Sequence, residues 1–302
     1  MIKAEHLVKK FGDKTAVDDL SFEVATNKVT GFLGPNGAGK STTMRLMVGL
    51  ANGRGTTLFN GKPLHAYNQP SEMVGIVFEA KAYHPTRTAR SHLEILAIEA
   101  NVPKSRVDEV LDIVGLKSEA NKGPGKFSLG MSQRLGLAAA LLSKPKFLLL
   151  DEPANGLDPE GIVWLRQLLI SYADKDHGVL VSSHLLSEMA QLADNVVVIG
   201  RGKLLADTSM KSFIAGNVGS SVYVRVSDST KMAQVFDKEK LPYKKVDDGF
   251  ELSGVKTDKI GQLAFINKVT ILELSIRSAS LEEAFLEVTA GSEEFAGKKA
   301  TK

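Results

Sequence analysis

Apolar, β-branched runs alternate with segments of helical character over the first two thirds of the chain. The apolar runs, each bounded by polar or turn residues, lie at 21–34, 72–79, 146–153, 178–184 and 195–205. The segments with helical spacing or composition lie at 40–50, 106–116, 131–143, 162–173 and 185–193. Because strands that alternate with helices assemble into a parallel sheet, this pattern predicts an α/β domain whose sheet is covered on both faces.

The pattern changes near Gly216 and predicts a second, smaller unit. Its segments lie at 220–227, 230–241, 243–254, 257–268 and 269–278, in the order β-α-β-β-α-β of a ferredoxin-like α+β unit. A last amphipathic helix is expected at 280–289, with Ser280 as its cap. We therefore expect one domain over residues 1–215 and a second over 216–290, followed by a short, polar, mobile tail over 291–302.

Composition excludes several classes of protein without naming one. The 302 residues are 43% hydrophobic, and 38 basic against 35 acidic side chains leave a net charge of +3. Such an even balance gives no reason to expect nucleic-acid binding. The chain has no cysteine, which excludes disulfides and thiolate metal sites. It shows neither a secretory signal nor a run of roughly 20 apolar residues, so we expect a cytoplasmic protein without a transmembrane segment.

A glycine-rich loop, GPNGAGKST, joins an apolar strand to the first predicted helix. Its spacing is that of a phosphate-binding loop, in which backbone N–H groups and the start of the helix hold phosphate oxygens. Lys40 is expected to reach the β- and γ-phosphates, and Ser41 to coordinate Mg²⁺. The complete loop consists of Gly34, Pro35, Asn36, Gly37, Ala38, Gly39, Lys40, Ser41 and Thr42. The alternative, a chance glycine turn, is disfavoured by the flanking strand and helix.

Two carboxylates, Asp151 and Glu152, follow the apolar run FLLL. An open α/β sheet binds its ligands at the carboxyl ends of its strands, beside the phosphate loop. We expect Asp151 to hold Mg²⁺ and Glu152 to accept a proton from the attacking water. A pair of solvated acids at a strand end is the alternative.

A third segment, KFSLGMSQRLGLAAALL, lies shortly before those carboxylates. Ser128 and Gly130 precede a helix expected to begin near Met131, which makes a second anion-binding helix start. An ordinary serine-capped helix is the alternative. With the phosphate loop and the acidic strand in this order, the segment resembles the signature of the ATP-binding-cassette (ABC) family, usually Leu-Ser-Gly-Gly-Gln. The serine and one glycine match, whereas the second glycine and the glutamine are replaced.

The resemblance implies a fold and further site residues. The fold would be a phosphate-loop ATPase of the ABC type over about residues 1–215, with a RecA-like core and a helical signature subdomain at about 80–145. Ser128 and Gly130 would meet the γ-phosphate on an opposite subunit, and Asp158, in ANGLDPEG, would reach across the same interface. His184 would polarise the attacking water or bind the γ-phosphate.

Phe11 and Glu79 occupy two further positions of the family pattern. Phe11 has the place of the aromatic ring that stacks on adenine, with a stray surface or core phenylalanine as the alternative. Glu79 stands where the family has a glutamine that touches Mg²⁺, and a carboxylate there can bind the metal while adding negative charge near the γ-phosphate. A one-residue misalignment with an exposed Glu79 is the alternative. The segment after it, KAYHPTRTARSHLEIL, resembles ATPases of antibiotic and lantibiotic-peptide resistance exporters.

The resemblance finally implies a function: the ATP-hydrolysing subunit of a transporter, with ATP and Mg²⁺ as cofactors. Its partners would be a second ATPase subunit, identical or different, and separate membrane permease subunits that dock near residues 79–96 on the cytoplasmic face of the membrane. No nucleic acid is expected. The alternative is a soluble, non-transport ATPase of the same class that acts on nucleic acid or ribosomes. For the small C-terminal unit we favour a role in dimerisation over ligand sensing, and the sequence does not name a transported substrate.

Overall fold

The structure is a computed structural model that describes residues 1–84, 86–217, 221–277 and 281–290. These residues form two compact units, Met1–Met210 with Thr289 and Ala290, and Lys211–Val288. The expected cap Ser280 and the expected mobile tail lie outside the described residues. Across the described ranges, the helices all fall short of the length and apolar content that a membrane crossing requires.

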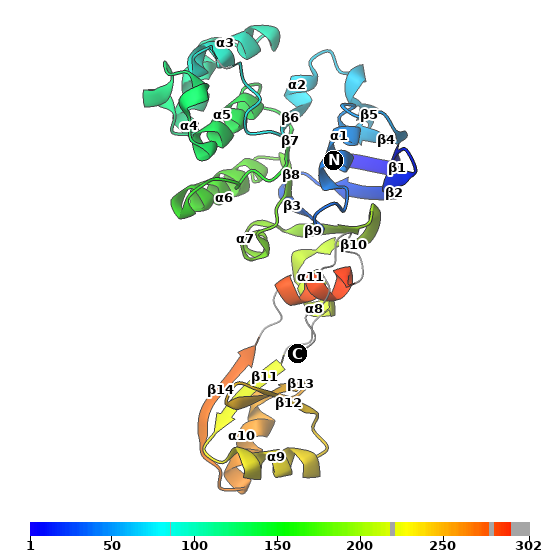
Figure 1. Ribbon diagram of the computed structural model, residues 1–302, viewed down its shortest axis with the longest axis vertical. Coiled ribbons are helices and arrows are strands. Elements are labelled where there is room, and N and C mark those ends of the chain that lie inside the picture. Colours follow the sequence, from blue (N-terminus) through cyan, green and yellow to red (C-terminus); the bar gives the residue numbers. More distant parts are fainter. Residues whose placement is uncertain (85, 218–220, 278–280, 291–302) are drawn as a thin grey trace. The chain divides into compact units, whose positions relative to one another are not determined.

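A six-stranded sheet forms the centre of the larger unit, in the order β10-β9-β3-β8-β7-β6 (Figure 1). Its strands are β3 (Lys28–Leu33), β6 (Val74–Val77), β7 (Phe147–Leu150), β8 (Gly178–Ser182), β9 (Asn195–Gly200) and β10 (Lys203–Ser209). All neighbours pair in parallel except β9 and β10. The expectation of one strand over 195–205 is therefore wrong. Arg201 and Gly202 adopt positive φ angles of 48° and 79° and reverse the chain between β9 and β10.

A second, antiparallel sheet was absent from the sequence expectations. It has the order β2-β1-β4-β5, with β1 (Ile2–Phe11), β2 (Lys14–Val24), β4 (Arg54–Phe59) and β5 (Lys62–Pro63). Its buried residues, among them Ile2, Leu20 and Phe22, share one core with Phe32 and Phe147 of the central sheet. The apolar residues of both sheets leave water in this shared core, which is the main favourable term in folding.

Helices cover the opposite face of the central sheet, while α1 (Lys40–Met47) and the antiparallel sheet cover the first face, so both faces are covered as expected (Figure 1). The helices of this unit are α1 (Lys40–Met47), α2 (Pro70–Met73), α3 (Ala89–Glu99), α4 (Ser105–Ile113), α5 (Leu129–Leu141), α6 (Pro159–Ala173) and α7 (Leu186–Leu192), with short 3₁₀ turns at Leu64–Ala66, Lys117–Glu119 and Pro124–Lys126. Helices α6 and α7 pack on β3, whereas α1 lies between the two sheets. Helices α3, α4 and α5 pack on one another, and α5 also packs on β6 of the central sheet.

The smaller unit contains a four-stranded antiparallel sheet in the order β12-β13-β11-β14. Its elements are β11 (Ser221–Val226), α9 (Ser229–Lys238), β12 (Tyr243–Val246), β13 (Gly249–Ser253), α10 (Thr257–Ile266) and β14 (Ile271–Arg277). This chain order and strand order are those of a split β-α-β-β-α-β unit. The rings of Phe236, Tyr243 and Phe250 pack against one another in its core, one pair tilted and two pairs edge to face. Two flanking helices, α8 (Met210–Asn217) and α11 (Leu281–Thr289), complete the chain's elements.

Candidate nucleotide-binding site

The glycine-rich loop connects β3 to α1 in a conformation that only glycine accommodates at two of its positions. Gly39 has a φ angle of 105°, and a Cβ atom there would lie 2.4 Å from the carbonyl oxygen of Ala16. A Cβ atom on Gly34 would lie 2.6 Å from the carbonyl oxygen of Ile199. Because both obstacles are backbone atoms, larger residues would displace the loop from the sheet. The loop is thus locked in place ahead of the first turn of α1.

Lys40 is the first residue of α1 and is largely buried. Its ammonium donates hydrogen bonds to the carbonyl oxygens of Gly34 at 2.7 Å and of Pro35 at 3.3 Å. Burial lowers the pKa of Lys40, and the nearby carboxylates of Glu152 and Asp151 partly oppose this shift. An ammonium can donate three hydrogen bonds, so Lys40 has one more to give to a ligand beyond these two. The start of α1 adds backbone N–H groups and the positive end of the helix dipole. The loop therefore offers an anion a cationic, donor-rich surface.

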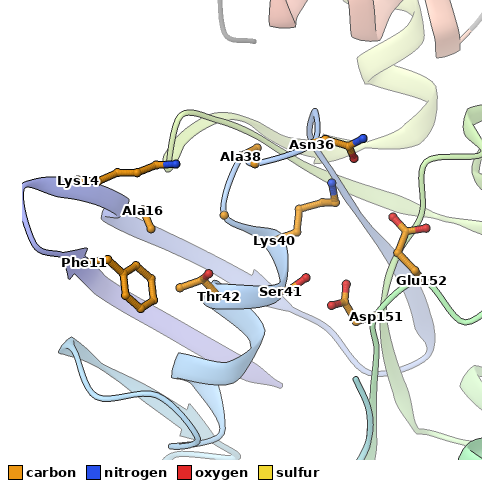
Figure 2. Close-up of a pocket in the computed structure, with 12 residues that line it drawn as sticks. Phe11, Lys14, Ala16, Asn36, Ala38, Lys40, Ser41, Thr42, Asp151 and Glu152 are labelled. Atoms are coloured by element: carbon orange, nitrogen blue, oxygen red, sulfur yellow. The ribbon is translucent and has the colours of Figure 1, made fainter. Parts of the chain in front are cut away.

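A cleft of about 530 Å³ opens over this loop (Figure 2). Ten of the expected residues line it, namely Phe11, Asn36, Gly37, Ala38, Gly39, Lys40, Ser41, Thr42, Asp151 and Glu152. Figure 2 shows the carboxylates of Asp151 and Glu152 facing Ser41 and Lys40. The expected loop residues Gly34 and Pro35 contribute through their bonds to Lys40 rather than as lining residues. Figure 2 places Lys40, Asp151 and Glu152 at one end of the cleft and Phe11 at the other.

Lys14 and Ala16 also line the cleft, and sequence reasoning did not select them. Both lie at the start of β2, which pairs with β1 so that Phe11 is opposite Lys14. The signal for Lys14 was its position three residues after the expected aromatic residue, across a tight Gly-Asp turn. Recognising it requires the hairpin, which the sequence patterns did not reveal.

Phe11 lies at the end of β1 with its side chain 57% exposed. The ammonium of Lys9 sits 4.7 Å from the centroid of its ring, a cation–π contact. The ring is therefore not a core residue, which removes one of the two alternatives for Phe11. A ring exposed at the rim of the cleft suits stacking against a base.

Asp151 and Glu152 follow β7 and share one buried hydroxyl. The hydroxyl of Ser182, at the end of β8, donates to Asp151 Oδ1 at 2.6 Å and accepts from the backbone N–H of Glu152 at 2.9 Å. Ser182 is completely buried. Sequence reasoning missed this residue, although it stands two positions before His184 at the end of a buried strand. Ser182 orients both carboxylate residues at the carboxyl edge of the sheet.

His184 contacts the carboxylate of Glu152 twice. Its ring nitrogen Nδ1 lies 2.7 Å from Glu152 Oε2, and its backbone N–H donates to the same oxygen at 3.3 Å. A histidine held against the expected general base can fix the direction of that carboxylate. The structure thus brings the two expected catalytic residues, Glu152 and His184, into direct contact.

Ser128, Gly130 and Asp158 lie outside the lining of the cleft. Ser128 caps α5 by accepting from the N–H of Met131 at 3.1 Å, and Asp158 caps α6 by accepting from the N–H of Gly161 at 2.9 Å. Helix α5 begins at Leu129, so the expected start near Met131 is wrong by about two residues. The reason is the cap itself, because the Ser128 side chain satisfies a first-turn N–H and lets the helix start directly after it.

The signature start of α5 packs directly on the loop that contains Asp158. A Cβ atom on Gly130 would lie 2.7 Å from the carbonyl oxygen of Gly156. On Gly156, a Cβ atom would likewise come within 2.4 Å of Leu129. These two expected interface segments therefore pack closely against each other.

Glu79 is not brought together with Ser41 and Asp151. Its side chain is 71% exposed, and its Oε1 atom accepts from Arg45 on α1 at 3.0 Å. Glu79 is not among the residues that line the cleft. A contact between Glu79 and Mg²⁺ therefore requires this carboxylate to leave Arg45 and turn towards the phosphate loop.

The residues that remain at the cleft fit Mg²⁺ arriving with a nucleotide. Within the described ranges, no group of three or more histidine or acidic side chains is arranged to hold a metal unaided. Ser41 and Asp151 line the same cleft and provide hard oxygen donors. Mg²⁺ is commonly bound through one or two protein oxygens together with substrate phosphates. This donor set suits a metal ion that the phosphates help to bind.

Comparison with known proteins places this site in a family. Residues 17–155 match the family described as "ABC transporter", and residues 220–282 match a domain of unknown function (DUF8746). The chain is 37% identical to the bacitracin transport ATP-binding protein BcrA of Bacillus licheniformis, with 96% of this chain and 98% of BcrA covered. It is 35% identical to the lantibiotic transport ATP-binding protein SrtF of Streptococcus pyogenes, with 68% of this chain and 90% of SrtF covered.

The fold also matches a solved structure, the dimer of an ATP-binding cassette in a post-hydrolysis state bound to ADP and Pi. The TM-score is 0.63 at 21% identity, and the match covers 70% of this chain and 99% of the other. This likeness confirms the ABC ATPase fold expected from the motifs. The fold, the phosphate loop and the relatives together show that the chain belongs to the ABC transporter family and is an ATP-binding, ATP-hydrolysing subunit of it.

Proposed function

We propose that this subunit powers the export of an antibiotic, an antimicrobial peptide or a similar amphipathic compound through separate membrane subunits. The observation that carries the proposal is the near full-length similarity to BcrA, whose name assigns it to bacitracin transport. The similarity to SrtF, named for lantibiotic transport, points to the same class of cargo. The alternative of a soluble ATPase acting on nucleic acid receives no support from these relatives.

For the hydrolytic step we propose that Lys40 and the loop hold the β- and γ-phosphates while Glu152 receives a proton from the attacking water. The water oxygen bonds to the γ-phosphorus, and the bond from that phosphorus to the β-bridging oxygen breaks, releasing ADP and phosphate. His184 keeps the Glu152 carboxylate oriented, which the 2.7 Å contact between them supports. Ser41 and Asp151 would hold Mg²⁺, which neutralises phosphate charge when bound.

We further propose that two copies of the chain close on two nucleotides. Ser128, Gly130 and Asp158 lie outside the cleft of their own chain, and the two segments that carry them pack against each other, with Ser128 and Asp158 at the surface. A second subunit could present this surface to the γ-phosphate, where the N-terminal end of α5 favours an anion. The solved relative in the comparison is likewise a dimer, with ADP and Pi bound.

The membrane subunits, in this proposal, dock near residues 79–96 and hold the ATPase at the cytoplasmic face of the membrane. Helix α3 exposes Ile95 and, just beyond that segment, Ile98, which is 68% exposed. A cavity of about 320 Å³ lies between the ends of α2, α3 and α5 and includes Leu96. Exposed apolar residues, and a cavity lined in part by the same helix, suit the docking of a short helix from a partner.

The proposal is tested by reconstituting the chain with the membrane protein encoded beside it in lipid vesicles. Vesicles with ATP outside are expected to accumulate fluorescent bacitracin or a labelled lantibiotic. Vesicles carrying the Glu152→Gln subunit, the matched control, should not. ATP hydrolysis without uptake of either peptide, together with unchanged peptide resistance of cells that lack the gene, would contradict the assignment of cargo.

A further inference from the structure

One buried side chain on the signature helix contacts the residue proposed as general base. Gln133 lies on α5 and is 7% exposed. Its Nε2 atom donates to the backbone carbonyl oxygen of Glu152 at 3.1 Å. Its other polar atom, Oε1, is buried without a hydrogen-bond partner among the described residues. A buried amide with an unpaired oxygen is unfavourable for stability, so packing alone does not explain a glutamine here.

Glu152 itself has a strained backbone that is held from both sides. Its φ angle is 50°, in the left-handed region that non-glycine residues rarely adopt. On one side its N–H donates to Ser182 Oγ at the end of β8, and on the other its carbonyl accepts from Gln133. Since the backbone direction sets where the side chain points, these two bonds help to aim the carboxylate at the cleft and at His184.

Gln133 also stands five residues after Ser128, the cap of α5. At about 1.5 Å of rise per residue, the two side chains are linked by roughly 7.5 Å of continuous helix. A helix of this length moves as a rigid body, so a displacement at its start reaches Gln133 with little loss. Ser128 is the residue proposed to meet the nucleotide of the opposite subunit.

We propose that Gln133 is a positioning residue that couples the signature start of α5 to the orientation of Glu152. When Ser128 binds the nucleotide of the partner subunit, α5 moves and Gln133 moves with it. The hydrogen bond from Gln133 to the Glu152 carbonyl then places the Glu152 carboxylate for hydrolysis in the chain's own cleft. Hydrolysis in one site then depends on occupancy of the other. This inference rests on the proposed dimer and on the proposed role of Glu152.

The test is Gln133→Met in the full chain with its membrane partner. Methionine has nearly the length of glutamine and lacks both the donor and the unpaired oxygen. Removal of the buried unpaired oxygen offsets the loss of the bond to the Glu152 carbonyl, so the variant should melt near the wild-type temperature. Loss of one hydrogen bond that orients the base predicts a fall in kcat of about 10-fold. The KM for ATP should remain unchanged, and the Hill coefficient for ATP should fall towards that of independent sites.

The matched control is Ser132→Ala on the same helix. Ser132 is also buried, but its hydroxyl lies 3.4 Å from that of Tyr83 and so is directed to Tyr83 rather than to Glu152. The kcat and the Hill coefficient of Ser132→Ala should stay within about twofold of the wild-type values. In a double-mutant cycle, Ser128→Ala should reduce kcat by a smaller factor in the Gln133→Met background than in the wild type.

Two results would overturn the coupling. One is a Gln133→Met variant whose kcat and Hill coefficient equal those of the wild type. The other is a double variant whose loss of kcat equals the product of the losses in Gln133→Met and Ser128→Ala alone. Glu152→Gln is measured beside these variants. If Glu152→Gln retains turnover, the base assignment itself fails, whereas an inactive Glu152→Gln with a normal Gln133→Met removes only the coupling.

Discussion

Replacing Ser182 by alanine should destabilise the ATPase unit more than its single lost hydroxyl suggests. The hydroxyl is completely buried, donates to the Asp151 carboxylate at 2.6 Å and accepts from the Glu152 N–H at 2.9 Å. A hydrogen bond to a charged group contributes about 1.5–3 kcal/mol, and an orphaned buried N–H costs about 1–3 kcal/mol. Allowing for relaxation we expect a loss of about 3 kcal/mol, which lowers the melting temperature of a unit of this size by about 6–12 °C.

Tryptophan fluorescence is a suitable assay, because the chain has one tryptophan and it lies in this unit. Trp164 is on α6, and the guanidinium of Arg134 lies 4.1 Å from its ring. Its emission therefore follows unfolding of the ATPase unit without a contribution from the smaller one. The comparison variant is Ser183→Ala, whose hydroxyl accepts one backbone N–H, that of Leu185, at 3.0 Å.

Ser183→Ala removes one neutral hydrogen bond and should reduce stability by only about 1 kcal/mol. A melting temperature of Ser182→Ala equal to that of Ser183→Ala would refute the argument that one hydroxyl supports both carboxylate residues. The kcat of Ser182→Ala should also fall at a temperature where the variant remains folded, because its Glu152 backbone has lost one of its two anchors.

Three further substitutions test other parts of the site. Gly39→Ala should weaken ATP affinity at least about 10-fold by equilibrium binding, because its Cβ atom would meet the Ala16 carbonyl at 2.4 Å, whereas Gly49→Ala, at a positive φ angle with open space around it, should bind normally. His184→Ala should lower kcat by about 100-fold without changing ATP affinity, since it frees the Glu152 carboxylate proposed as general base; an unchanged kcat would argue against this role of His184. Glu79→Gln should shift the Mg²⁺ concentration that gives half-maximal hydrolysis, and an unchanged Mg²⁺ dependence would favour the alternative of a one-residue misalignment with Glu79 exposed.

Local sequence patterns predicted those parts of the site that are contiguous along the chain. The phosphate loop could be recognised because its glycines, Lys40 and Ser41 act within one strand-loop-helix unit. Ser182 and Gln133 could not, because their importance arises from contacts with Glu152 that form only when β7, β8 and α5 come together. A serine at a strand end and a glutamine on a helix carry no distinguishing local signal.

The errors in the fold have similar causes. The antiparallel sheet escaped notice because register shifts of β1 against β2 and β4 interrupt the regular alternation of buried and exposed residues. The run 195–205 looked like one strand because both halves are apolar, and only the positive φ angles at Arg201 and Gly202 divide it. Glu79 shows a further limit, since a family position identifies a residue but not the partner, here Arg45, that holds its side chain.

The central claim is that two chains trap ATP and that Glu152 starts its hydrolysis. The most direct measurement is the mass of the Glu152→Gln variant by light scattering, with Mg²⁺ and either ATP or ADP. With ATP we expect twice the 32.5 kDa of one chain and turnover reduced by orders of magnitude, and with ADP we expect a single chain. A variant that hydrolyses ATP at the wild-type rate, or that stays at 32.5 kDa with saturating ATP, would contradict the account.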